Sequence, residues 1–291
     1  MFSIILPTWN NLPYLQLAVR SIREHSAQDH QIIVHVNDGS DGTLDWVRAQ
    51  GLDHTATPQN VGVCYAVNMA TRHVRGDHVL YLNDDMFVLP GWDASLARHA
   101  EQLRARGIAS YLLSGTMVQP PDQPAAAPFV SGATVFADYG RTPETFEEAR
   151  LLADRGKLVR GYWRGSIWPP TLVTTEDWLR VGGYSVELSP GMSSDNDFAM
   201  KLWHAGCRIF VGIGDALVYH FGCVSTGRIV TNDGRKQFLR KWGITQRDFD
   251  TMILRRGDDL PAEEVFTPID AQALEPALKR ARWRGAIKAR L

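Results

Sequence analysis

The chain has 291 residues, of which 44% are hydrophobic and 22% charged, and its formal net charge at pH 7 is -1. This length and composition allow a sizeable buried core and exclude a mainly disordered protein, while the balanced charge gives no general attraction for nucleic acid. The three cysteines, Cys64, Cys207 and Cys223, lie far apart without a CxxC pair, which argues against a disulfide framework or a structural zinc site and favours buried thiols in a reducing compartment.

The first 117 residues alternate between strand-like and helix-like patterns. Amphipathic segments with helical spacing separate four short apolar runs, at 3–6, 31–36, 78–82 and 108–117. This alternation is typical of a doubly wound sheet of parallel strands. Because such sheets bind ligands beyond the carboxyl ends of their strands, we expect a site in the loops at 7–11, 37–43 and 83–90.

The alternation ends at a connector, residues 118–128, which carries four prolines and three consecutive alanines. Beyond it the patterns predict helices at 143–155, 175–181 and 195–205, and strands at 171–174, 208–211 and 217–220. No basic segment precedes the first apolar residues and no run of about 20 apolar residues occurs, so neither a secretion signal nor a membrane span is predicted.

Acidic residues follow two of the predicted strands. The loop 37–43 places Asp38 where a carboxylate could accept a hydrogen bond from a base N–H or a ribose hydroxyl. Asn83, Asp84 and Asp85 end another strand, and carboxylate oxygens are the ligands that Mg²⁺ and Mn²⁺ prefer. Adjacent residues on an extended chain point in opposite directions, so we expect one direct carboxylate ligand there. Taken alone, either loop also fits an ordinary polar turn.

Residues 194–197, with the sequence Ser-Asp-Asn-Asp, open a predicted helix. One of them is accounted for by helix capping, since Ser and Asp satisfy free N–H groups and acids complement the helix dipole. A second carboxylate at this place would have a low pKa and could accept a proton from a hydroxyl group. His220 ends a predicted strand and is either a structural histidine or a metal ligand.

The last fifteen residues, 277–291, contain six basic residues and no acidic one, with Trp283 and Ile287 four positions apart. Two interpretations fit this pattern. The segment is either a solvated tail helix or a peripheral contact with anionic lipid.

Taken together and in this order, the motifs resemble inverting glycosyltransferases of family 2, which have the GT-A fold. The segments that carry the resemblance are 4–10, 36–40, 60–68, 81–85, 181–184, 194–198 and 202–206. The resemblance implies an α/β fold with a mostly parallel, Rossmann-like sheet flanked by helices and a C-terminal helical extension. We divide the chain into a nucleotide-sugar-binding half (1–117), an acceptor-binding and catalytic half of the same domain (118–231), and the extension with its basic tail (232–291).

The resemblance implies metal-dependent transfer of a sugar from a nucleotide diphosphate sugar, with UDP favoured, to a hydroxyl of a glycan or lipid-linked acceptor. Asp195 is the implied general base, and Asp85 and His220 are the implied ligands of Mn²⁺ or Mg²⁺. The implied nucleotide-binding residues are Pro7, Thr8, Asn10, Asp38, Asn68, Asn83 and Asp84. Trp168 and Asp197 are the implied acceptor-binding residues, and Arg228 is a further candidate contact for phosphate.

The chain departs from the family pattern at two positions. Asn83 stands where the DXD motif begins, which leaves Asp85 as the direct metal carboxylate. Ser194 stands where the family has an acid, so that Asp195 loses its acidic neighbour.

Three other functions stay open: a metal-dependent phosphohydrolase, a sugar nucleotidyltransferase and a non-catalytic carbohydrate-binding protein. A two-metal hydrolase needs several direct ligands, but this chain has one short acidic cluster near a histidine. A nucleotidyltransferase would have a Gly-rich basic loop after the first strand, and residues 7–10 are not one. We expect the aromatic segment 162–168 to be exposed, and it fits either a lectin or an acceptor site. We expect a cytoplasmic protein, and the family resemblance favours glycan assembly at the inner membrane face.

Overall fold

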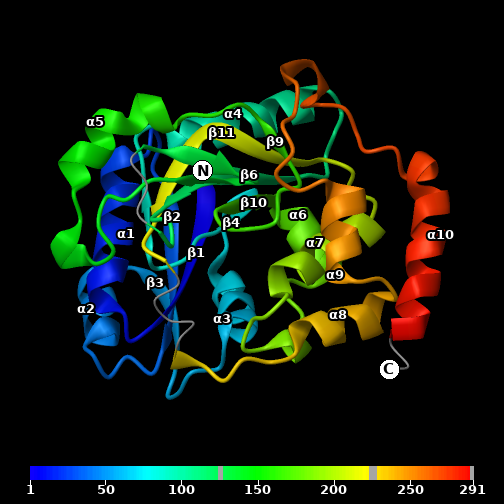
Figure 1. The fold of residues 1–291 in the computed structure, drawn as a ribbon. Coiled ribbons are helices and arrows are strands. Elements are labelled where there is room, and N and C mark those ends of the chain that lie inside the picture. The colour runs from blue at the N-terminus through cyan, green and yellow to red at the C-terminus, as the bar shows by residue number, and fades with distance from the viewer. Residues whose placement is uncertain (124–126, 223–227, 289–291) are drawn as a thin grey trace.

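An eleven-stranded sheet runs through the protein, with helices on both faces (Figure 1). This is a computed structural model, and it describes residues 1–123, 127–222 and 228–288. Eight strands lie side by side in the order β3 (Asp53–Thr57), β2 (Gln31–Asn37), β1 (Phe2–Trp9), β4 (His78–Tyr81), β10 (Thr171–Thr174), β6 (Leu112–Gln119), β11 (Phe210–His220) and β5 (Met86–Val88). The three remaining strands flank β6 and β11 and are β7 (Phe129–Ser131), β8 (Thr134–Phe136) and β9 (Trp163–Arg164).

The predicted alternation of strands and helices in the first half is confirmed. Strands β1 to β4 pair in parallel, and the helices between them are α1 (Leu12–His25), α2 (Thr43–Ala49) and α3 (Val63–Ala70). From β10 onward the sheet is mixed, because β10 runs antiparallel to both β4 and β6 while β11 is parallel to β6. The carboxyl ends of β1, β2 and β4 therefore meet at one edge of the sheet.

Two large hydrophobic cores, beside a smaller third cluster, lie on opposite faces of the sheet. Successive side chains of a strand point to opposite faces, so Ile4 packs in one core and Ile5 in the other. Helices α1 and α4 (Trp92–Ala105) cover the first face. Helices α3, α6 (Thr175–Val181) and α7 (Ser194–His204) cover the second. The helix predicted at 175–181 is confirmed as α6, and it is capped by Thr174, whose hydroxyl accepts a hydrogen bond from Asp177 N.

Two predicted elements differ in the structure. The predicted strands at 208–211 and 217–220 form the single strand β11, whose pairing with β6 shifts register between Ile213 and Leu217. The predicted helix at 143–155 begins with a short 3-10 turn and becomes α5 (Glu148–Leu158).

The expected exposure of the aromatic segment 162–168 is wrong for Trp163. Its ring lies on Gly212, where a Cβ atom would fall 1.8 Å from a ring atom, and its Nε1 donates to Thr116 Oγ1 (2.9 Å). Trp163 is therefore part of the sheet packing, while Trp168 is 38% exposed.

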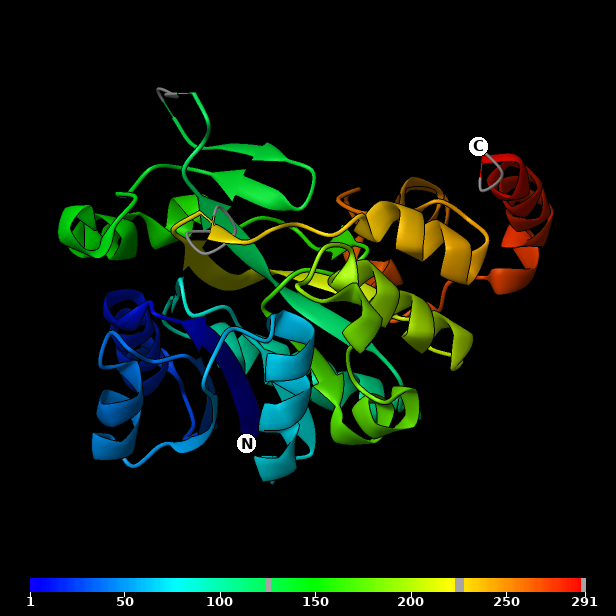
Figure 2. The same ribbon diagram turned by 90° about the horizontal axis from the view of Figure 1, so that it is seen from below.

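The C-terminal helical extension packs on the α7 side of the protein, away from α1 and α2 (Figure 2). It contains α8 (Gly234–Trp242), α9 (Gln246–Asp248), a π-helical turn η5 (Phe249–Leu254) and α10 (Ala271–Lys288). The basic tail is helical as predicted, and Trp283 is 70% exposed; residues 289–291, which include Arg290, lie outside the described residues.

No helix in the described ranges combines the length and the apolar character that a membrane crossing requires. The predicted burial of the thiols is confirmed for Cys64 and Cys207. Cys223 lies outside the described residues.

Candidate functional site

A cleft of about 230 Å³ opens at the edge where β1, β2 and β4 end. One wall comes from the loops after these strands and includes Thr8, Asn37 and Asp85. The other comes from the loop before α7 and its first turn, including Pro190 and Asp195. The cleft therefore brings together two of the three acidic motifs that the sequence singled out, 83–85 and 194–197, although they lie in different halves of the chain.

Six of the predicted site residues line this cleft: Pro7, Thr8, Asn83, Asp84, Asp85 and Asp195. A seventh, His220, contacts the wall from β11, with Nε2 at 3.4 Å from Asp85 Oδ1, and both side chains are buried. Its Nδ1 is 3.1 Å from Gln119 Oε1. The predicted metal-binding pair is thus in direct contact.

Glycine brings the two walls together at the start of α3. Gly62 has a φ of +79°, and a Cβ atom there would lie 2.8 Å from Pro190 Cα. The next residue, Val63, donates its backbone N–H to the Pro190 carbonyl (3.1 Å). A side chain at Gly62 would therefore push the loop before α7 away from the ends of β1, β2 and β4.

The acidic end of β4 is short of internal hydrogen bonds. Asp84 Oδ2, Thr8 Oγ1 and Asn11 Nδ2 are buried, and among the described residues none of these atoms has a hydrogen-bond partner. Burial and the neighbouring Asp85 raise the pKa of Asp84, while Thr8 and Asn11 lie near enough to lower it without reaching hydrogen-bond geometry. An unpaired buried polar atom costs folding free energy, so this wall is suited to bind the polar groups of a ligand or a cation.

The donor set at the end of β4 fits a hard divalent cation. Asp85 supplies a carboxylate and His220 an imidazole, and Mg²⁺ or Mn²⁺ commonly take one or two protein ligands and complete their shell with phosphate and water. In the described part of the chain the one compact group of three acidic or histidine ligands is Glu24, His25 and Glu148, at the end of α1 and the start of α5, and none of them lines this cleft. Arg20 already pairs with both of those acids.

Asp38 and Asn10 form a second polar layer beside the cleft and are not among its lining residues. Asn10 Nδ2 donates to Asp38 Oδ2 (2.9 Å), and Gly39 N donates to Asn10 Oδ1 (3.0 Å). Asn10 thus joins the loops after β1 and β2. Asn37, which the sequence analysis missed, does line the cleft, and its Oδ1 accepts from Val61 N (2.9 Å).

Asp195 lies in the first turn of α7 and is partly buried on the cleft wall. Its Oδ1 accepts a hydrogen bond from the Tyr184 hydroxyl (2.8 Å). Burial raises the pKa of Asp195 to about 6, although the bond from Tyr184 lowers it. The expectation of a low pKa at this helix N-terminus is therefore wrong, because loss of hydration outweighs the helix end. A pKa near 6 still leaves the carboxylate mainly ionised at pH 7, as a general base requires.

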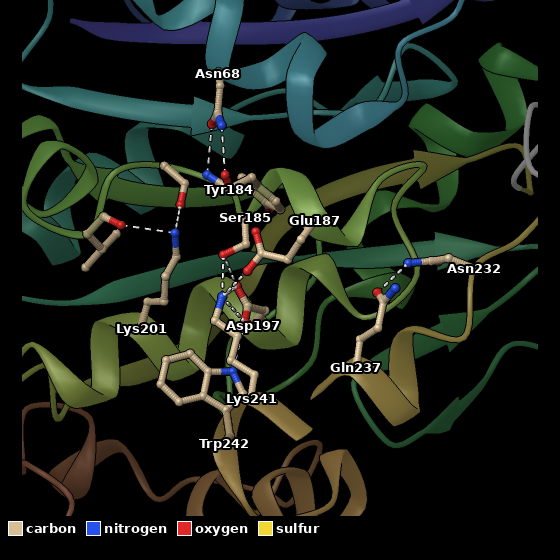
Figure 3. Close-up of polar contacts among 12 residues, drawn as sticks. Asn68, Tyr184, Ser185, Glu187, Asp197, Lys201, Asn232, Gln237, Lys241 and Trp242 are labelled. Carbon is tan, nitrogen blue, oxygen red and sulfur yellow. Dashed lines mark hydrogen bonds and ion pairs between the residues drawn. The ribbon is translucent and has the colours of Figure 1, made fainter. Parts of the chain in front are cut away.

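Asn68 does not occupy the nucleotide-binding position predicted for it. Its Nδ2 donates to the Tyr184 carbonyl (2.7 Å) and its Oδ1 accepts from Tyr184 N (2.8 Å), as Figure 3 shows. Both ends of the amide are bonded within the protein, and Asn68 does not line the cleft. Its role in the fold is to fix Tyr184, which in turn bonds Asp195. Tyr184 itself escaped the sequence analysis, although it follows two glycines in one of the quoted motifs.

Asp197 contradicts its predicted contact with an acceptor. The residue has no exposed surface, and its carboxylate accepts hydrogen bonds from Ser185, Lys241 and the Trp242 indole (Figure 3). An acceptor cannot reach a carboxylate enclosed in this way. The acid belongs to the support of α7 and not to a binding surface.

Trp168 and Arg228 lie at the margins of the site. Trp168 stands just before β10, whose Thr171 pairs with Tyr81 at the end of β4, and the Arg256 guanidinium lies 3.8 Å from its ring centroid. Arg228 donates to the Trp9 carbonyl (2.8 Å) and lies 4.6 Å from the Trp9 ring centroid. Trp168 thus keeps an exposed face near the strand-end loops, and Arg228 covers the end of β1.

Comparisons with known proteins agree with the α/β fold described above. Residues 3–146 match the model of the family described as glycosyl transferase family 2. The uncharacterized glycosyltransferase YfnE of Bacillus subtilis (strain 168) is 29% identical over 89 residues, which are 29% of this chain. The matching region spans 23% of the length of YfnE.

Solved structures of TarS from S. aureus share the fold. The crystal structure of TarS 1-349 in complex with UDP-GlcNAc has a TM-score of 0.56 at 14% identity, covering 83% of this chain and 65% of that one. A second crystal structure of TarS 1-349 has a TM-score of 0.54 at 14% identity, covering 99% of this chain and 89% of that one. At this identity the likeness shows the architecture alone.

Proposed function

We propose that this chain, which belongs to glycosyltransferase family 2 through residues 3–146 and has the GT-A fold, is a metal-dependent, inverting glycosyltransferase. It would transfer a sugar from a nucleotide diphosphate sugar to a hydroxyl group. One observation carries the proposal: Asp195 and Asp85, from opposite halves of the chain, line a single cleft at the carboxyl edge of the sheet. Membership of this family favours a transferase over the hydrolase, the nucleotidyltransferase and the non-catalytic binding protein.

The base side of the mechanism follows from the bonding of Asp195. The Tyr184 hydroxyl donates to Oδ1, which leaves Oδ2 to receive the proton of an acceptor hydroxyl. Because the pKa of Asp195 is raised to about 6, its carboxylate is both ionised at neutral pH and basic enough to accept that proton. The acceptor oxygen would then attack the anomeric carbon on the face opposite the diphosphate, which inverts the configuration.

On the donor side, Asp85 and His220 would hold Mn²⁺ or Mg²⁺. Bound there, the cation would offset the negative charge that builds on the departing diphosphate. Thr8, Asn11 and Asp84 offer buried polar atoms for the nucleotide. The family resemblance and the complex of TarS with UDP-GlcNAc favour a uridine nucleotide. Trp168 would stack on a sugar of a glycan or lipid-linked acceptor through its exposed ring face.

The first test is a thermal-shift screen of UDP, GDP and dTDP, each with and without Mn²⁺. A ligand that binds the folded chain raises its melting temperature in proportion to its affinity, so we expect the largest shift for UDP with Mn²⁺. If none of the three nucleotides raises the melting temperature, the donor assignment is contradicted.

The second test concerns the base. Asp195→Asn should reduce transfer on the order of 10² to 10⁴-fold and leave the UDP shift unchanged. Asp45→Asn, the same chemical change at a side chain 90% exposed on α2, is the control. Unchanged turnover in Asp195→Asn would remove this residue from the mechanism.

A further inference from the structure

The residues that flank Asp195 are held by the C-terminal extension. On one side, Ser193 Oγ donates to Gln246 Oε1 (2.7 Å). On the other, Asn196 Nδ2 donates to Asp250 Oδ1 (2.7 Å), and Gln246 Nε2 donates to Asn196 Oδ1 (3.0 Å). The start of α7 is therefore bonded to α9 and η5 both before and after the candidate base.

The most enclosed of these contacts joins Asp197 to the end of α8. Lys241 Nζ lies 3.0 Å from Asp197 Oδ1, and Trp242 Nε1 donates to the same oxygen (2.8 Å), as Figure 3 shows. Asp197 is fully buried, and a buried carboxylate is stable only when it is paired and hydrogen-bonded. Lys241 therefore supplies the positive charge that stabilises the buried Asp197 carboxylate, and with it the position of the first turn of α7.

Lys241 also reaches the second support of the base. Its Nζ donates to Ser185 Oγ (2.7 Å) and to Glu187 Oε1 (2.8 Å). Ser185 directly follows Tyr184, whose hydroxyl bonds Asp195. One ammonium group thus connects the segment that carries Tyr184 with the helix that carries Asp195.

Resting on the proposed role of Asp195, we propose that Lys241 is a positioning residue for the base and acts through Asp197 and Ser185. Lys241 does not line the cleft and so has no contact with the nucleotide there. Its loss should shift or loosen Asp195, and a displacement of about 1 Å at a reacting group can cost about 100-fold in rate. The nucleotide-binding loops end strands that pair with their neighbours, so donor binding should stay as it is.

The test compares Lys241→Met with Lys241→Arg, which keeps the charge, and with Lys236→Met, an exposed lysine of the same helix. The assay follows the slow hydrolysis of UDP-GlcNAc by the full-length chain with Mn²⁺, in which water takes the place of the acceptor hydroxyl and UDP is released. We expect kcat to fall about 10- to 100-fold in Lys241→Met with the donor KM within about twofold of wild type. Lys241→Arg should keep most of the rate, and Lys236→Met should match wild type.

A double variant separates positioning from general loss of stability. In Lys241→Met with Asp197→Asn no uncompensated charge is buried, so kcat should recover in part relative to Lys241→Met alone. Trp242→Phe removes one hydrogen bond to Asp197 and keeps an aromatic ring beside His204. This milder variant tests the same contact if Lys241→Met does not fold. It should lower kcat less than Lys241→Met and leave the donor KM unchanged.

Hydrogen exchange of the free chain gives a readout that needs no turnover. Amides of residues 193–197 should exchange faster in Lys241→Met than in Lys236→Met, while those of β1 and β4 should not change. If the wild type is active and Lys241→Met has the same kcat and the same exchange rates, the inference is overturned and the proposed function stays intact. If Asp195→Asn releases UDP as fast as the wild type, both are overturned.

Discussion

The two walls of the cleft are built in different ways. Thr8 lies near the end of β1 and Asp85 follows β4; β1 pairs with β2 from Ser3 to Trp9 and with β4 from Phe2 to Ile5. Asp195 instead follows Ser193, a non-glycine residue with a φ of +64°, and depends on side chains from distant parts of the chain. The strand-end wall is therefore fixed by the backbone of the sheet, and the base wall by a network of polar side chains. Substitutions should separate these walls, with donor binding sensitive to the first and the chemical step sensitive to the second.

The largest effect on the strand-end wall is expected from Asp85→Ala. Loss of this proposed metal ligand should weaken binding of UDP in the presence of Mn²⁺ by about 100-fold, because the cation would link the nucleotide phosphates to the protein. Titration calorimetry with and without Mn²⁺ measures this effect. Without Mn²⁺ the variant and the wild type should bind UDP equally, and equal binding with Mn²⁺ present would show that the metal site lies elsewhere.

A smaller effect is expected on the base wall from Tyr184→Phe. The Tyr184 hydroxyl lowers the pKa of Asp195, which burial raises to about 6. The base is active when ionised, so kcat/KM should fall as the pH drops below about 6 in the wild type. Removing a hydrogen bond to a charged group should move this limb upward by about one pH unit.

The pH profile of kcat/KM measures that shift. At pH 8 Tyr184→Phe should approach the wild-type rate, and at pH 6 it should be slower by severalfold. Tyr65→Phe, which alters a tyrosine 45% exposed, serves as the control. A profile of Tyr184→Phe that lies on the wild-type curve would mean that the acid limb belongs to another group.

Asn68→Ala tests the two walls separately. The sequence analysis assigned Asn68 to nucleotide binding, on the strand-end wall, whereas its side chain supports Tyr184 on the other wall. Because Asn68 bonds the backbone of Tyr184, we expect UDP affinity within about twofold of wild type and kcat lower by about 3- to 10-fold. Asn83→Ala, at a residue that lines the cleft, should show the opposite pattern. A loss of UDP affinity in Asn68→Ala that exceeds its loss of kcat would restore the original assignment.

These contrasts also explain how far the sequence could be interpreted. Local pattern placed the segments of Asp85 and Asp195 at the end of a strand and in the first turn of a helix, the family resemblance singled out Thr8, and all three residues line the cleft. Asn68 and Asp197 were assigned wrongly because their partners, the Tyr184 backbone and Lys241, lie far along the chain. Local pattern does not show where a polar side chain will find its partner, and burial of a carboxylate likewise depends on the assembled fold.

Trp163 and Asn37 illustrate the same limit in the core and in the cleft. An aromatic residue beside glycines was compatible with exposure, and its burial depends on Gly212 of a strand far along the chain. Asn37 ends β2 next to the acidic loop that drew attention, yet it is Asn37 that lines the cleft and Asp38 that lies outside the lining. The sequence thus located the correct edge of the sheet, and the packing of side chains decided which residues face the cavity.

The smallest effect on catalysis is expected at the basic tail, which lies on neither wall. Ala281 and Gly285 face the protein, and a Cβ on Gly285 would lie 2.2 Å from the Gly243 carbonyl oxygen, whereas Trp283 and Ile287 are exposed among basic residues. If this face contacts anionic lipid, Trp283→Ala should reduce sedimentation with phosphatidylglycerol vesicles severalfold and leave turnover unchanged. Leu179→Ala, at a leucine 71% exposed on α6, is the matched control. Equal sedimentation of the wild type with phosphatidylglycerol and with phosphatidylcholine vesicles would leave the tail as a solvated helix, since the basic residues would then add no attraction for the anionic surface.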